Sequence, residues 1–151
     1  MLFRTHLAFA LLLFCLIIGT FKGMLLFLIF VLIGAAFVDI DSSSSKIGKA
    51  WFLRPLQYIV RHRGMFHSLL FSIFISVLVW FVNKNAGYGF ALGYGSHLFL
   101  DCLTPIGLKV LWPFSDAVFR FPIVRTGSLI ENMIFVLMLL GDVFLVYRII
   151  F

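Results

Sequence analysis

Histidine and aspartate residues at short, defined spacings are the side chains of this sequence best suited to chemistry. His97 and Asp101 are four residues apart, so on a helix both side chains project from the same face. Asp39 and Asp41 are two apart and directly precede four serines, where we expect a helix to end. Carboxylates are unfavourable there because a helix C-terminus carries partial negative charge. A bound cation or a basic side chain should therefore compensate them.

The remaining histidines extend this set. His62 and His67 stand in the segment HRGMFH, where Gly64 lets the backbone turn between them, and His6 begins the first apolar run. Imidazole and carboxylate groups together match the ligands of zinc, manganese or iron. We predict a site for one or two divalent ions, with zinc favoured over manganese and iron. The predicted ligands are His6, Asp39, Asp41, His62, His67, His97 and Asp101.

Three polar residues are candidates for a direct part in catalysis: Asp41, Arg63 and Glu131. Asp41 is our choice of general base. Arg63 lies between two histidines, and its guanidinium group suits an anion such as phosphate. Glu131 has a rival explanation, since the segment SLIE from Ser128 to Glu131 matches a helix capping box. A single interfacial histidine is likewise more often a neutral, hydrogen-bonded side chain than a metal ligand.

Long apolar runs must position these groups. The chain has 151 residues, a mean hydropathy of +1.15, 63% apolar residues and 12% charged residues, which excludes an ordinary soluble domain. The runs cover about residues 7–21, 24–38, 66–82, 86–103 and 129–150. Each is near the length that crosses about 30 Å of hydrocarbon. The sequence predicts an all-α, polytopic integral membrane protein, one domain over residues 1–151 with about five transmembrane helices, or four as the alternative.

The positive charges orient this arrangement. Of the 12 Lys and Arg residues, nine fall on one side of the predicted spans and three on the other, so the N-terminus and both long loops should be cytoplasmic. Every histidine and four of the six acidic residues then lie near that same face of the plasma or inner membrane. Anionic lipid headgroups explain the net charge of +6 without a nucleic-acid partner. The sequence gives no indication of the oligomeric state.

Four motifs together resemble a known family: TH near the start, DID, HRGMFHS and GYGSHLFLDCLTPIGLKVLWPFS. They are similar to the YdjM-like family of inner-membrane proteins classed as metal-dependent hydrolases, over about residues 5–131. The resemblance implies a metal-binding role for the same seven residues reached above. It identifies neither the bond that is cleaved nor the substrate.

These observations favour a membrane-bound, metal-dependent hydrolase that activates water against an ester or phosphoester. A site at headgroup depth points to a membrane lipid as substrate, with a soluble cytoplasmic substrate as the alternative. A transporter for protons or metal ions is a rival, but its ionisable groups should lie near the midplane. Only Asp142 lies deep in a predicted span, and we expect it to pair with a basic group or another helix. A non-catalytic, metal-stabilised membrane protein is the third reading.

Overall fold

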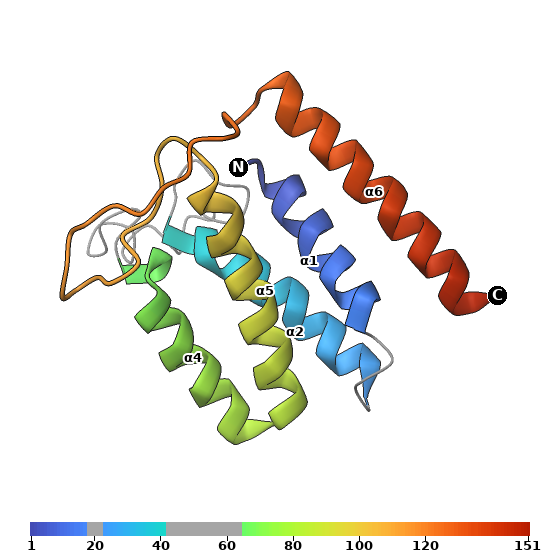
Figure 1. The fold of residues 1–151 in the computed structure, drawn as a ribbon. Coiled ribbons are helices and arrows are strands. Elements are labelled where there is room, and N and C mark those ends of the chain that lie inside the picture. The colour runs from blue at the N-terminus through green and yellow to red at the C-terminus, as the bar shows by residue number, and fades with distance from the viewer. Residues whose placement is uncertain (18–22, 42–64) are drawn as a thin grey trace.

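The computed structural model describes residues 1–17, 23–41 and 65–151, and within these ranges the regular secondary structure is helical (Figure 1). The helices are α1 (Phe3–Ile17), α2 (Met24–Phe37), the 3-10 turns η2 (Val38–Asp41) and η4 (Met65–His67), α4 (Leu69–Val82), α5 (Lys84–Cys102) and α6 (Leu129–Ile150). No strand occurs among the described residues, where a single antiparallel bridge joins Leu108 to Phe119. The all-α prediction is therefore confirmed.

Each predicted apolar run overlaps one of the five α-helices of the described residues. Within the described ranges, α6 alone has both the length and the apolar composition to cross a membrane, while α1, α2 and α4 are shorter apolar helices. Helix α4, with 14 residues, extends about 21 Å, less than the hydrocarbon core of a typical bilayer. A topology of five spans therefore stays a prediction.

Helix α5 lies at the centre of the arrangement and contacts α1, α2 and α4, whereas α6 packs on α1 at the edge (Figure 1). Helix α5 lies close to α2 because two glycines of α5, Gly89 and Gly93, face the α2 backbone. A Cβ added at Gly93 would lie 1.9 Å from the carbonyl oxygen of Val31, and one added at Gly89 would lie 2.5 Å from that of Phe27. Only glycine at these positions lets the two helix backbones approach so closely.

One end of this helical arrangement gathers the starts of α1, α4 and α6 and the ends of α2 and α5. The backbone N–H of Leu2 donates to the side chain of Glu131, which links the starts of α1 and α6. The N-terminal ammonium group of Met1 donates to Asp101 near the end of α5. The turn between α4 and α5 lies at the opposite end (Figure 1). Residues from distant parts of the sequence therefore meet at one end of the protein.

Candidate metal centre

Helix α5 provides the first two members of the candidate site. His97 and Asp101 are separated by one helical turn, and both are buried, at 0% and 2% exposure. His97 Nε2 lies 3.7 Å from Asp101 Oδ2. The spacing of four residues therefore brings the imidazole and the carboxylate together as predicted.

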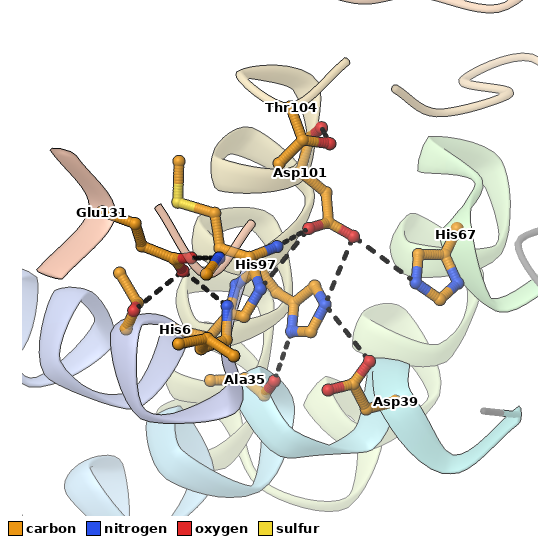
Figure 2. A network of polar contacts seen from close by, with 12 residues as sticks. His6, Ala35, Asp39, His67, His97, Asp101, Thr104 and Glu131 are labelled. Atoms are coloured by element: carbon orange, nitrogen blue, oxygen red, sulfur yellow. Dashed lines mark hydrogen bonds and ion pairs between the residues drawn. The ribbon is translucent and has the colours of Figure 1, made fainter. Parts of the chain in front are cut away.

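Two histidines from other elements face the same carboxylate (Figure 2). His6 Nε2 from α1 lies 3.4 Å from Asp101 Oδ1, and His67 Nε2 from η4 lies 3.6 Å from Asp101 Oδ2. The rings of His6 and His97 are stacked, with centroids 3.7 Å apart and planes 8° from parallel. Asp101 thus stands at the centre of three imidazoles that come from three elements.

A backbone contact fixes the orientation of the His97 ring. His97 Nδ1 donates to the carbonyl oxygen of Ala35 in α2 at 2.7 Å. His97 Nε2 then faces Asp39 Oδ1 at 3.8 Å and Asp101 Oδ2 at 3.7 Å, and it makes no hydrogen bond to any described residue. A histidine that ligates a metal commonly donates its other ring N–H to a backbone carbonyl in this way. His97 Nε2 therefore has the environment of a metal ligand.

The described residues form two sets that could hold a metal ion. One set is His6, His97 and Asp101, the other is Asp39, His67 and His97, and within each set the ligand atoms lie within 4.8 Å of one another. Burial raises the pKa of Asp39, which lies beyond the end of α2, so the protein opposes the ionised form of this carboxyl. A nearby cation would favour that form. The donor types and the unpartnered His97 nitrogen fit a divalent ion of the zinc class.

Comparison with known proteins gives the family. A family model described as "YdjM inner membrane protein" matches residues 1–149. The chain belongs to the YdjM family. The membership agrees with the apolar composition, and it places the chain in a family of inner membrane proteins.

Relatives of known sequence support the same assignment. The chain is 36% identical over 107 residues to "Inner membrane protein YdjM" of Escherichia coli (strain K12), and it has the same identity with the protein of that name from Shigella flexneri; each match covers 64% of this chain and 54% of the relative. It is 35% identical over 107 residues to "Uncharacterized protein YvsG" of Bacillus subtilis (strain 168), covering 68% of this chain and 66% of that protein. The matched part thus spans about half the length of the two YdjM proteins. No solved structure matches.

Glu131 in this YdjM-family chain joins two helices. Its Oε1 accepts hydrogen bonds from Leu2 N at 2.5 Å and Thr5 Oγ1 at 3.0 Å, and its Oε2 accepts from Gly127 N at 2.6 Å. Ser128 caps α6 as predicted, because its Oγ accepts from Glu131 N at 3.2 Å. The Glu131 carboxylate bonds to Gly127 and not to Ser128, so the capping box is half formed. These bonds hold α1, and with it His6, at the start of α6.

Part of the predicted set lies outside the described residues, namely His62 and Arg63. The structure describes the backbone of Asp41 as the last residue of η2, and the position of its side chain is also outside the description. The roles of these three residues stay predictions.

Asp142 lies away from the candidate metal centre, three turns along α6 from Glu131. It is 3% exposed, and its carboxylate oxygens make no hydrogen bond to any described residue. Among the described residues Asp142 therefore has no basic partner, and of the two predicted alternatives, a basic group or another helix, the structure shows the packing of α6 on α1.

Sequence reasoning missed two backbone partners in the centre. The carbonyl group of Ala35, which orients His97, has no side-chain signature. The amide group of Leu2, which binds Glu131, is equally invisible to a search for functional side chains. The available signal was the small-residue segment GAA at residues 34–36, which lets the His97 ring approach the α2 backbone.

Proposed function

We propose that this YdjM-family protein is a membrane-bound metal-dependent hydrolase, and that its His/Asp cluster holds the ion. The observation that carries the proposal is the environment of His97. Its Nδ1 is committed to the Ala35 carbonyl, and its buried Nε2 faces two carboxylates without a hydrogen bond to a described residue. The Met1 ammonium group contacts Oδ1 of Asp101, whereas the His97 lone pair faces Oδ2 of Asp101 and Oδ1 of Asp39, so a cation between these three atoms would relieve their repulsion.

His6, Asp39, His67, His97 and Asp101 would hold the ion, and zinc is the favoured metal. Both candidate sets use His97, whose Nδ1 is already bonded, so the available Nε2 can ligate only one ion at a time. The described residues therefore favour one ion. A second ion would draw on the other oxygen of Asp101 and on Asp41 or His62.

When bound, a divalent ion would polarise a water molecule for attack on an ester or phosphoester. The chain's own groups would then do the rest. Asp41 is the proposed proton acceptor, and Arg63 is the proposed contact for a negatively charged oxygen of the substrate. We propose a membrane lipid as substrate, because the cluster lies where several helices begin and end and not halfway along them. The proposed location of the cluster is the cytoplasmic side.

The first test is elemental analysis of detergent-purified protein by inductively coupled plasma mass spectrometry. Wild type should carry near-stoichiometric zinc, manganese or iron, and a His67→Ala, His97→Ala double variant should lose it. Asp142→Asn is the matched control, since it alters a buried acid outside the cluster and should keep the metal. Equal trace metal in wild type and double variant would refute the metal centre.

The second test is a thin-layer assay of the metal-loaded protein against a panel of phospholipids. Release of a lipid product by wild type, absent in the folded double variant, would support hydrolysis. Stoichiometric metal without release from any lipid would refute the lipid substrate while leaving the metal centre in place.

A further inference from the structure

The outer face of α4 and α5 carries a long apolar groove. One part, of about 600 Å³, is lined by residues that include Leu69, Ile73, Val77, Tyr88, Ala91 and Gly95. A second part, of about 460 Å³, continues past the end of α5 toward the loop that contains Val110 and Phe119. The two parts share Leu69 and Gly95. They therefore form one groove along the length of α4.

A polar hollow adjoins this groove at the turn between α4 and α5. It has a volume of about 540 Å³, its lining includes Asn83 and Lys84, and it shares Trp80 with the apolar groove. The ammonium group of Lys84 lies 5.5 Å from the centroid of the Trp80 ring, a cation–π contact. No ion pair joins Lys84 to a carboxylate of the described residues. A positive charge is thus available where the apolar groove ends.

We propose that this groove and hollow bind one phospholipid, with an acyl chain along α4 and α5 and the anionic phosphate beside Lys84. Charge complementarity supports this occupant, because an uncharged groove that ends at a cation and a tryptophan matches a molecule with an apolar tail and an anionic head. Tryptophan and lysine are typical of headgroup depth in membrane proteins. A packed helix could fill the groove, but its apolar side chains would not pair with the Lys84 ammonium group.

The groove is also continuous with the apolar surface of the protein. Ile73 and Val77 line it, and neighbouring side chains of α4, Phe74, Leu78 and Phe81, are exposed. In an inner membrane protein such a surface contacts lipid, so an acyl chain reaches the groove without crossing water.

This lipid is distinct from the proposed substrate. His67 precedes α4 and Asp101 is near the end of α5, whereas Trp80 and Lys84 flank the turn between the two helices at the opposite end (Figure 1). Binding at Lys84 does not depend on metal or on hydrolysis. The two proposals can therefore fail separately.

Gly95 allows the groove to be filled with little disturbance of the fold. A Cβ added at Gly95 meets no atom within 4 Å, so a larger side chain there enters the groove and not the packed interior. Gly95→Phe should block the acyl chain, and Lys84→Gln should weaken binding of the headgroup. Val143→Phe on the 62% exposed outer position of α6 is the control for added bulk. Arg148→Gln in the last turn of α6 is the control for lost charge.

The measurement is native mass spectrometry of the delipidated protein titrated with phosphatidylglycerol in mild detergent. Wild type and both controls should bind one phosphatidylglycerol molecule. Gly95→Phe should bind this lipid at least roughly tenfold more weakly. Lys84→Gln should bind it about fivefold more weakly, because one basic group at an anionic surface contributes about 1 kcal/mol. Gly95→Leu, which adds less bulk, should also weaken binding.

Three results would overturn the proposal. They are no bound lipid in wild type, equal binding by Gly95→Phe and Val143→Phe, and a protein dimer that forms without lipid and is lost in Gly95→Phe. The last would assign the groove to a second copy of the chain.

Discussion

His6 and His97 stack face to face, with ring centroids 3.7 Å apart, although His6 lies in the first turn of α1 and His97 lies near the end of α5. The contact holds α1 against α5 at the level of Asp101, which both imidazoles face. Side chains that converge on one carboxylate from separate helices depend on the distances between those helices. Substitutions that alter helix packing should therefore also change the geometry of the candidate metal centre.

Gly93→Ala should separate α2 from α5 and weaken metal binding. The added Cβ would lie 1.9 Å from the Val31 carbonyl oxygen, so the helices must move apart, at a cost of about 1–3 kcal/mol. The movement would pull the Ala35 carbonyl away from His97. Gly95→Ala is the matched control, because the added Cβ meets no atom within 4 Å and alanine stabilises a helix by about 1 kcal/mol relative to glycine. Thermal unfolding and a zinc titration of both variants check this, and similar losses in both would contradict it.

Glu131→Gln should destabilise the junction of α1 and α6. The neutral amide keeps one acceptor oxygen but loses the charge that three donors share, and hydrogen bonds to charged groups contribute about 1.5–3 kcal/mol each. We expect the unfolding free energy in detergent to fall by about 2 kcal/mol, with zinc content kept at saturating zinc. Ser128→Ala, which removes only the cap, should cost about 1 kcal/mol. Loss of bound zinc in Glu131→Gln at unchanged stability would instead make Glu131 a ligand.

Asp142→Leu should leave the protein as stable as wild type or more stable. The Asp142 carboxylate is buried and makes no hydrogen bond to a described residue, so the substitution removes a polar group whose burial costs about 1–3 kcal/mol. Thermal unfolding in detergent checks this, with Asp142→Asn as the isosteric comparison. Strong destabilisation by both would mean that the carboxylate has an essential partner.

Removal of the metal should lower the stability of the folded protein. An ion present at 100 times its Kd stabilises the state that binds it by about 2.7 kcal/mol. Zinc should therefore raise the Tm of chelator-treated wild type, and His97→Ala should show no shift. A shift of equal size in His97→Ala would place the zinc elsewhere.

Cysteine labelling tests the predicted topology. In a variant in which Cys15 and Cys102 are replaced by alanine, Asn83→Cys should react with a membrane-impermeant maleimide added outside spheroplasts. Thr126→Cys should react only after the membrane is opened. Asn83 and Thr126 are both exposed, so the difference reports the side of the membrane. Labelling of both cysteines from outside would contradict the five-span topology with a cytoplasmic cluster.

Local periodicity made part of the structure predictable from the sequence. The pairing of His97 with Asp101 follows from one helical turn, and each long apolar run became a helix because burial and helical hydrogen bonding agree there. The predicted start of α4 was too early, because residues 65–67 form a 3-10 turn and Ser68 caps the helix. The apolar run began earlier than the cap.

The partners of Glu131 were beyond prediction for a different reason. The capping of α6 is local, whereas the bonds from Leu2 and Thr5 to Glu131 span 129 and 126 residues of sequence. One sequence gives no sign of such long-range contacts. The stacking of His6 on His97 is likewise a product of tertiary packing.

The link between Glu131 and the start of α1 also bears on biogenesis. Helices of a membrane protein leave the ribosome in order, yet α1 is held in place by α6, which emerges after it. His6 therefore receives its final support only after translation has passed residue 131. The candidate metal centre is therefore complete only once α6 is in place, and the metal proposed for it would mark chains in which α6 is correctly inserted.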